Sequence, residues 1–157
     1  MLSLFVFISV LVPAVIYLAL PKTLEVLSGK KAPSTLPLAV GGFLFFISWY
    51  LPSPLIHGDF TAFNTHFVGG GLFTGFLWIY IKNHLKLKLH PLYDLLALYA
   101  LVNALGVANE LWELALTELK IFKISPFDTW WDLFANNLGA LTLWVLYYIY
   151  QKLKKQK

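Results

Sequence analysis

The chain has 157 residues, of which 59% are hydrophobic, 17% are aromatic and 13% are charged, and its formal net charge is +4. This composition is foreign to soluble globular domains and predicts an integral membrane protein. The chain has no cysteine and no arginine, which excludes disulfides and thiolate metal sites and argues against a nucleic-acid partner.

Five apolar runs follow one another along the chain. Because lipid offers no hydrogen-bond partners to a bare backbone, runs that approach about 20 residues predict transmembrane helices. The second run is the shortest and is closed by Pro52 and Pro54. We expect the first run to be a retained helix, because it lacks the basic start and the small-residue cleavage site of a signal peptide. The predicted helices cover about residues 4–20, 36–51, 63–81, 92–116 and 131–150.

The positions of the lysines predict the orientation of these helices. Lysine is in excess in the connections after the first and third runs and in the C-terminal tail, whereas the other two connections carry little net positive charge. Cytoplasmic connections are the ones enriched in lysine. The sequence therefore predicts a single all-α integral membrane bundle over residues 1–157, a multi-pass protein of the cell membrane with its N-terminus outside and its C-terminus inside.

Ionisable side chains lie inside or at the outer rim of the last three runs, where each costs roughly 3 kcal/mol unless it is paired or faces water. His66 lies one turn into the third run, and Glu110 and Glu113 lie near the outer end of the fourth. Asp132 lies at the outer start of the fifth run. Because these side chains have similar depths on one side of the predicted membrane, we expect them to meet in one polar cluster.

Helical spacing adds amide side chains to this cluster. Asn103 precedes Glu110 by seven residues, and Asn136 follows Asp132 by four, so each shares a helix face with its acid. Glycines at 69–71 and 75 predict close approach of another helix beside His66. An acid after Ser125-Pro126-Phe127 suits a helix N-terminus as well as the cluster. The additional candidate members are Asn103, Asp128, Asn136 and Asn137.

Three motifs resemble those of the VanZ-like membrane proteins or of a related bacterial multi-pass family. They are His66-Phe67, Glu110-Leu111-Trp112-Glu113, and a D-x-x-x-N-x-x-G pattern that runs from Asp132 to Gly139. The resemblance covers roughly residues 63–146. It departs from the family at Asn64, near which an acid is usual, and in lacking the arginine often found before the last motif. The resemblance implies a protein of the bacterial cell envelope, with a link to glycopeptide resistance.

Two functions from different classes fit the predicted cluster. In the first, which the sequence favours, the cluster binds a lipid headgroup or a partner protein, including a second copy of the chain, or locks the helices together. In the second, the chain is an intramembrane enzyme for a lipid-linked envelope substrate. Its acid and base residues would then be His66, Glu110, Glu113 and Asp132, and a divalent metal is a candidate cofactor with His66, Glu110 and Asp132 as its ligands.

Overall fold

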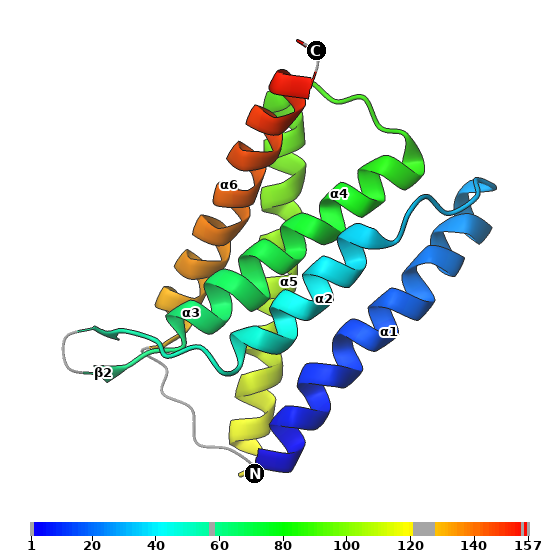
Figure 1. Cartoon of the computed structure of the whole chain (residues 1–157). Coiled ribbons are helices and arrows are strands. Elements are labelled where there is room, and N and C mark those ends of the chain that lie inside the picture. The colour runs from blue at the N-terminus through cyan, green and yellow to red at the C-terminus, as the bar shows by residue number, and fades with distance from the viewer. Residues whose placement is uncertain (1, 57–58, 121–127, 155, 157) are drawn as a thin grey trace.

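The computed structural model describes residues 2–56, 59–120, 128–154 and 156. Helices dominate this part of the chain, and Figure 1 shows them as long rods packed side by side. A minimal antiparallel hairpin of two-residue strands is the other regular element. In chain order the elements are α1 (Leu2–Ser28), α2 (Leu36–Ser48), β1 (Leu55–Ile56), β2 (Asp59–Phe60), α3 (Phe63–Thr65), η1 (His66–Leu72), α4 (Phe73–Leu85), α5 (Pro91–Glu118) and α6 (Asp128–Lys154).

The helix bounds differ from the predicted ones mainly at the ends. The first helix does not stop before Pro21 but continues to Ser28. Leu24, beyond the proline, packs with Leu20 against the core formed by α2 and α4. Pro21 lies inside the helix, where it has no N–H to donate to the backbone ladder, and the packing of Leu24 supports the turn that follows it. The second helix ends earlier than predicted, at Ser48, and the other three extend a few residues past their predicted limits at one or both ends.

The sequence predicted a uniform α-helix over residues 63–81. The structure instead divides this third rod into three consecutive segments. The elements α3, η1 and α4 follow one another without a gap, and η1 is a seven-residue π-helix with Gly69, Gly70 and Gly71 at its centre. A π-helix widens the backbone by an extra residue in a turn, and such segments often occur at functional sites. His66 is the first residue of this widened segment.

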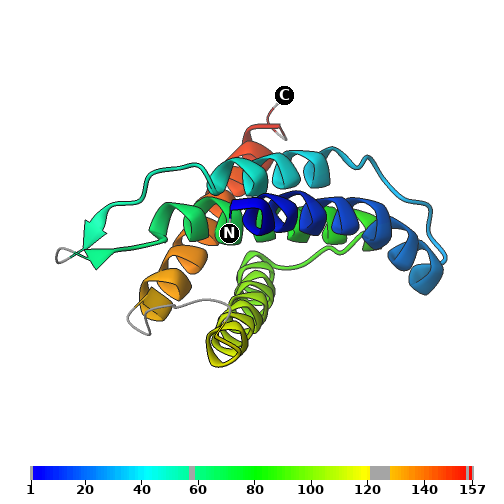
Figure 2. The ribbon, with the colours of Figure 1, turned by 90° about the horizontal axis from the view of Figure 1, so that it is seen from below.

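Two apolar clusters hold the rods together. The first joins α2 to α4 through Leu38, Phe73, Leu77 and Tyr80, with side chains of α1 packed against it. The second joins α5 to α6 through Leu98, Val102 and Ala140, with Trp78 of α4 beside it. Figure 1 shows that α5 and α6 lie close together at the end that carries the C-terminus, where Trp144 contacts Asp94, and diverge toward the opposite end. Seen from below, the end of α5 and the start of α6 lie apart (Figure 2).

Glycines permit the close contact between η1 and α6. A Cβ atom on Gly71 would lie 2.7 Å from the Cα of Gly139, and a Cβ on Gly139 would lie 3.0 Å from the Cα of Gly71. Side chains larger than hydrogen do not fit where two backbones approach this closely. The predicted approach of a second helix beside His66 is therefore confirmed, and the approaching helix is α6.

The all-helical fold is confirmed, and two of the described helices are long and apolar enough to cross a membrane. These are the Val10–Ser28 part of α1 and the whole of α5, Pro91–Glu118. The helix α2 is apolar but has 13 residues. The π-helix interrupts the third rod, and polar residues line one face of α6. The five-span membrane topology remains a prediction.

Candidate functional site

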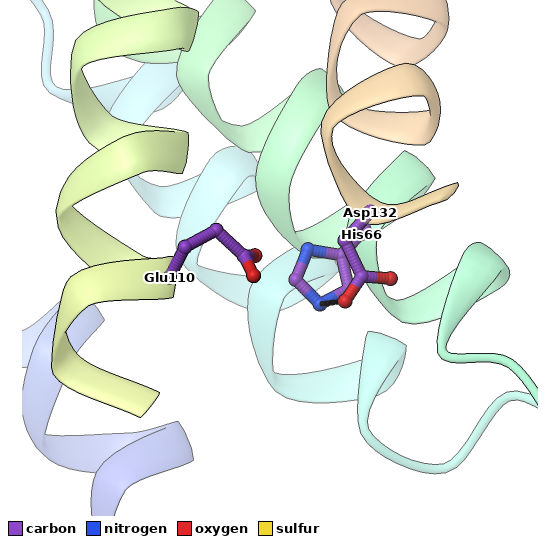
Figure 3. Close-up of side chains that lie close together, drawn as sticks. All are labelled: His66, Glu110 and Asp132. Atoms are coloured by element: carbon purple, nitrogen blue, oxygen red, sulfur yellow. Dashed lines mark ion pairs between the residues drawn. The ribbon is translucent and has the colours of Figure 1, made fainter. Parts of the chain in front are cut away.

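Three of the predicted site residues meet at the end of the bundle where α5 and α6 diverge. His66 comes from η1, Glu110 from α5 and Asp132 from α6, and one possible ligand atom from each lies within 4.8 Å of the other two. The His66 Nε2 atom is 3.2 Å from the Asp132 Oδ2 atom. Figure 3 shows the Glu110 carboxylate facing this pair from the opposite helix. The predicted proximity of these three residues, here called the triad, is confirmed.

The helix contact described above explains why Asp132 is buried. Gly139 touches η1, and Asp132 lies seven residues earlier on the same face of α6, so it also points toward η1. Its side chain is 2% exposed, against 13% for His66. Burial to this degree is rare for a carboxylate unless other groups offset its charge. The imidazole of His66 supplies one such group.

Asn136 supports the triad from one turn further along α6. Its buried side chain interacts with the imidazole of His66. It fits between two glycines on different helices: a Cβ on Gly70 would overlap the Asn136 Oδ1 atom, and one on Gly106 would lie 3.2 Å from Nδ2. The sequence predicted Asn136 as a member of the cluster. It gave no role to Gly106, although this residue lies one helical turn before Glu110 on the same face.

Asn103 and Asn137 form a reciprocal pair between α5 and α6. The Nδ2 atom of Asn103 donates to Oδ1 of Asn137 at 3.0 Å, and Nδ2 of Asn137 donates to Oδ1 of Asn103 at 3.1 Å. Each amide also donates to the backbone carbonyl four residues earlier. These contacts use the amides for joining two helices, so we assign the pair a structural role.

Two predicted site residues are not part of the triad. Glu113 lies one turn after Glu110, and its Oε1 atom accepts a 2.8 Å hydrogen bond from Nδ2 of Asn109 on its own helix. The structure thus does not bring Glu113 into the set of candidate metal ligands. Asp128 is the first residue of α6, but its side chain lies outside the described part of the chain.

A second buried carboxylate, Asp94, lies at the opposite end of the bundle, and none of its partners was predicted from the sequence. Asp94 accepts hydrogen bonds from Trp78 Nε1 at 2.8 Å and from Trp144 Nε1 at 3.1 Å. It also forms an ion pair with Lys82, whose Nζ atom is 2.8 Å from Oδ2. Trp78 and Lys82 are four residues apart and so share a face of α4. This spacing was the one sequence feature that could have predicted their common partner. This arrangement, here called the Asp94 clamp, fastens α4, α5 and α6 together.

The charges of the triad differ from those of the Asp94 clamp. Asp94 is neutralised by a lysine, whereas the triad places two carboxylates beside one imidazole. The chain has no arginine. Two carboxylates at this distance repel each other unless a proton or a cation lies between them. The triad is therefore suited to binding a positive group, to sharing a proton, or to holding a divalent ion.

Comparisons with protein-family models, curated proteins and solved structures found no match. The resemblance to the VanZ-like proteins, and the link to glycopeptide resistance that it implies, therefore stay predictions from the three motifs.

Proposed function

We propose that this chain is a multi-pass membrane protein of the cell envelope, and that its triad binds the polar headgroup of a lipid or lipid-linked molecule at the outer membrane face. The apolar composition supports the membrane part of this proposal, as do the two helices long enough to cross a bilayer. Large apolar side chains are exposed along α1 and α5. Lipid tails would cover them in a membrane.

The observation that carries the headgroup proposal is the contrast between Glu110 and its neighbours on α5. Val107, Leu111, Trp112 and Leu114 are all exposed, whereas Glu110 turns inward to the triad. Acyl chains that lie on this apolar surface bring the attached headgroup to the level of Glu110. A site of this kind combines an apolar approach with a few convergent polar groups, as ligand sites generally do.

The absence of cysteine allows a direct test of the topology. Single cysteines replace exposed residues on the two sides of the predicted fourth span. Lys88→Cys lies in the connection before the span and Glu118→Cys lies after it. In intact cells a membrane-impermeant maleimide should label Glu118→Cys, and should label Lys88→Cys only after the membrane is permeabilised. Labelling of both in intact cells, or the reverse pattern, would contradict the proposed orientation.

Headgroup binding is tested on detergent-purified, delipidated protein by native mass spectrometry. We expect the wild-type chain to retain phosphatidylglycerol or phosphatidylethanolamine in preference to diacylglycerol, which has the same tails and no phosphate headgroup. Glu110→Gln should abolish this preference, and Glu118→Gln, an exposed acid at the end of the same helix, should preserve it. Equal retention of the three lipids by wild type would refute headgroup recognition.

A second candidate function is hydrolysis of a lipid-linked substrate, and the His66 to Asp132 contact favours it. A carboxylate that holds an imidazole in one orientation is a common arrangement for a general base. The test is mass spectrometric detection of released headgroups from phospholipids in nanodiscs, with wild type beside His66→Gln. Product that forms at the same rate with both proteins would exclude His66 as the base.

A further inference from the structure

We infer that the triad is a binding site for one divalent metal ion, with an imidazole nitrogen of His66 and carboxylate oxygens of Glu110 and Asp132 as its protein ligands. The inference rests on the proposed function, because the ion would offer its remaining coordination positions to the phosphate of a headgroup. A bound cation would explain how a cluster with two acids can bind an anionic phosphate.

The donor set is the first argument. One imidazole and two carboxylates are ligands that zinc and manganese accept, and three protein ligands leave a position open for water or substrate. Ligand atoms around a tetrahedral zinc ion stand about 3.4 Å apart. The His66 Nε2 to Asp132 Oδ2 distance of 3.2 Å is close to this value. The three possible ligand atoms lie within 4.8 Å of one another. To reach the spacing around a zinc ion, the Glu110 carboxylate would move a short way toward the other two groups, which its long side chain allows.

Charge is the second argument. The triad brings two carboxylates and one imidazole within reach of one another, and a divalent cation can bind all three groups at once. The Asp94 clamp shows how the same chain treats a carboxylate used only for structure: it supplies a lysine and two indole N–H donors. In the triad the groups that meet are of the metal-ligating kind, namely imidazole and carboxylate.

The surrounding framework is the third argument. Each ligand stands on a different helical element, and the glycine contact between η1 and α6 fixes two of them relative to each other. Asn136 contacts His66, and its side chain fits there because residue 70 is a glycine, since a Cβ at that position would overlap the Asn136 amide. A neighbour that orients a ligating imidazole is the usual companion of a metal site, and its loss typically lowers metal affinity by about 10 to 100-fold.

The first experiment measures metal stoichiometry. The full chain is purified in detergent, stripped with EDTA, reloaded with Zn²⁺ or Mn²⁺, passed through a desalting column and analysed for metal content. We expect about one ion per chain for wild type and for Glu118→Gln, and clearly substoichiometric metal for Glu110→Gln and for Asp132→Asn, because each of these lacks one protein ligand. Wild-type protein without bound metal, or equal binding by all four proteins, would overturn the inference.

The second experiment reports ligation directly and does not depend on how well the acid variants fold. His66→Cys places a single thiol in a chain that otherwise has none. Loading with Co²⁺ should produce the intense thiolate-to-cobalt charge-transfer absorption, and Glu118→Cys, loaded in the same way, should not show it. If His66→Cys is folded by circular dichroism and gives no such absorption, position 66 is not a ligand.

The two proposals fail separately. A chain that holds the ion but retains phospholipid and diacylglycerol equally keeps the metal site and loses the headgroup function. A chain that prefers phospholipid equally well in EDTA and in Zn²⁺, and that takes up no metal, keeps the headgroup function and loses the metal site.

Discussion

At the scale of single residues, the groups around two buried acids distinguish a structural carboxylate from a candidate site residue. Asp94 and Asp132 are both buried, and both lie on helices close to the ends of the bundle. Asp94 has a lysine and two tryptophan donors arranged around its oxygens. Asp132 instead faces an imidazole and a second carboxylate. Removing the charge of Asp94 and removing the charge of Glu110, the carboxylate that faces Asp132, should therefore have opposite consequences in the metal-free protein.

Removing the charge of Asp94 should destabilise the fold. Asp94→Asn leaves Lys82 partly buried without its carboxylate partner, and we expect the free energy of unfolding to fall by about 2 kcal/mol. Unfolding by SDS titration measures this. In the double variant Lys82→Gln with Asp94→Asn, part of the loss should be recovered, because no charge is then left unpaired. Equal stability of wild type and Asp94→Asn would show that the clamp is dispensable.

Removing the charge of Glu110 should change the melting temperature in a direction that depends on whether metal is bound. In EDTA we expect Glu110→Gln to melt at or above the wild-type temperature, because it relieves repulsion with Asp132. In Zn²⁺ the order should reverse, since an ion at 100 times its Kd stabilises the wild-type chain by about 2.7 kcal/mol. Scanning fluorimetry with Glu118→Gln as control checks this. The same order of melting temperatures in both buffers would contradict it.

The meeting of His66, Glu110 and Asp132 could be predicted from the sequence, but the predicted acid and base set also included Glu113, which the structure does not place among the candidate metal ligands. Depth along each apolar run placed His66, Glu110 and Asp132 at one level, and three acids or bases at one level in an apolar bundle must find partners. Glu113 shares that level and a helix face with Glu110. It was predicted as a site residue, yet it contacts Asn109 on its own helix. Which of two acids one turn apart reaches across depends on helix rotation, which hydropathy does not specify.

At the scale of elements, the π-helix η1 is what places His66 opposite Asp132, and glycine contacts fix it. The apolar runs predicted five helical segments, because long apolar stretches have no other way to satisfy their backbone. The widened turn was not predictable, since three consecutive glycines are as compatible with an α-helix or a loop. The structure shows their use: Gly69 faces Ser48, Gly70 faces Asn136 and Gly71 faces Gly139.

Substituting the glycines of this contact should have graded effects. In Gly139→Ala the new methyl group meets backbone atoms of Phe67 and Gly71, which cannot move away without shifting η1. In Gly75→Ala it meets the end of the Leu143 side chain, which can rotate. We expect Gly139→Ala to lose at least about 2 kcal/mol of unfolding free energy and Gly75→Ala to lose less. Equal losses in SDS titration would argue against a backbone contact.

At the scale of the whole molecule, the two ends of the bundle differ in how they are joined. The Asp94 clamp ties α5 to α4 and α6 at one end, and the Asn103 to Asn137 pair adds a tie farther along. Beyond these ties the end of α5 and the start of α6 lie apart (Figure 2), and Glu110 is the α5 member of the triad. A metal ion in the triad would therefore join the diverging ends, as the clamp already joins the others.

This difference predicts a movement confined to one end. Spin labels on Glu118→Cys and Trp130→Cys report the α5 to α6 distance near the triad, and labels on Tyr93→Cys and Leu153→Cys report it near the clamp. On adding Zn²⁺ we expect the first distance distribution to narrow and shorten in electron double resonance, because the ion draws Glu110 toward Asp132, and the second to stay unchanged. Adding Glu110→Gln to the first pair should abolish the change. A shift at both ends would mean that Zn²⁺ moves the helices by acting elsewhere, and no shift at either end would mean that the ion adds no link between α5 and α6.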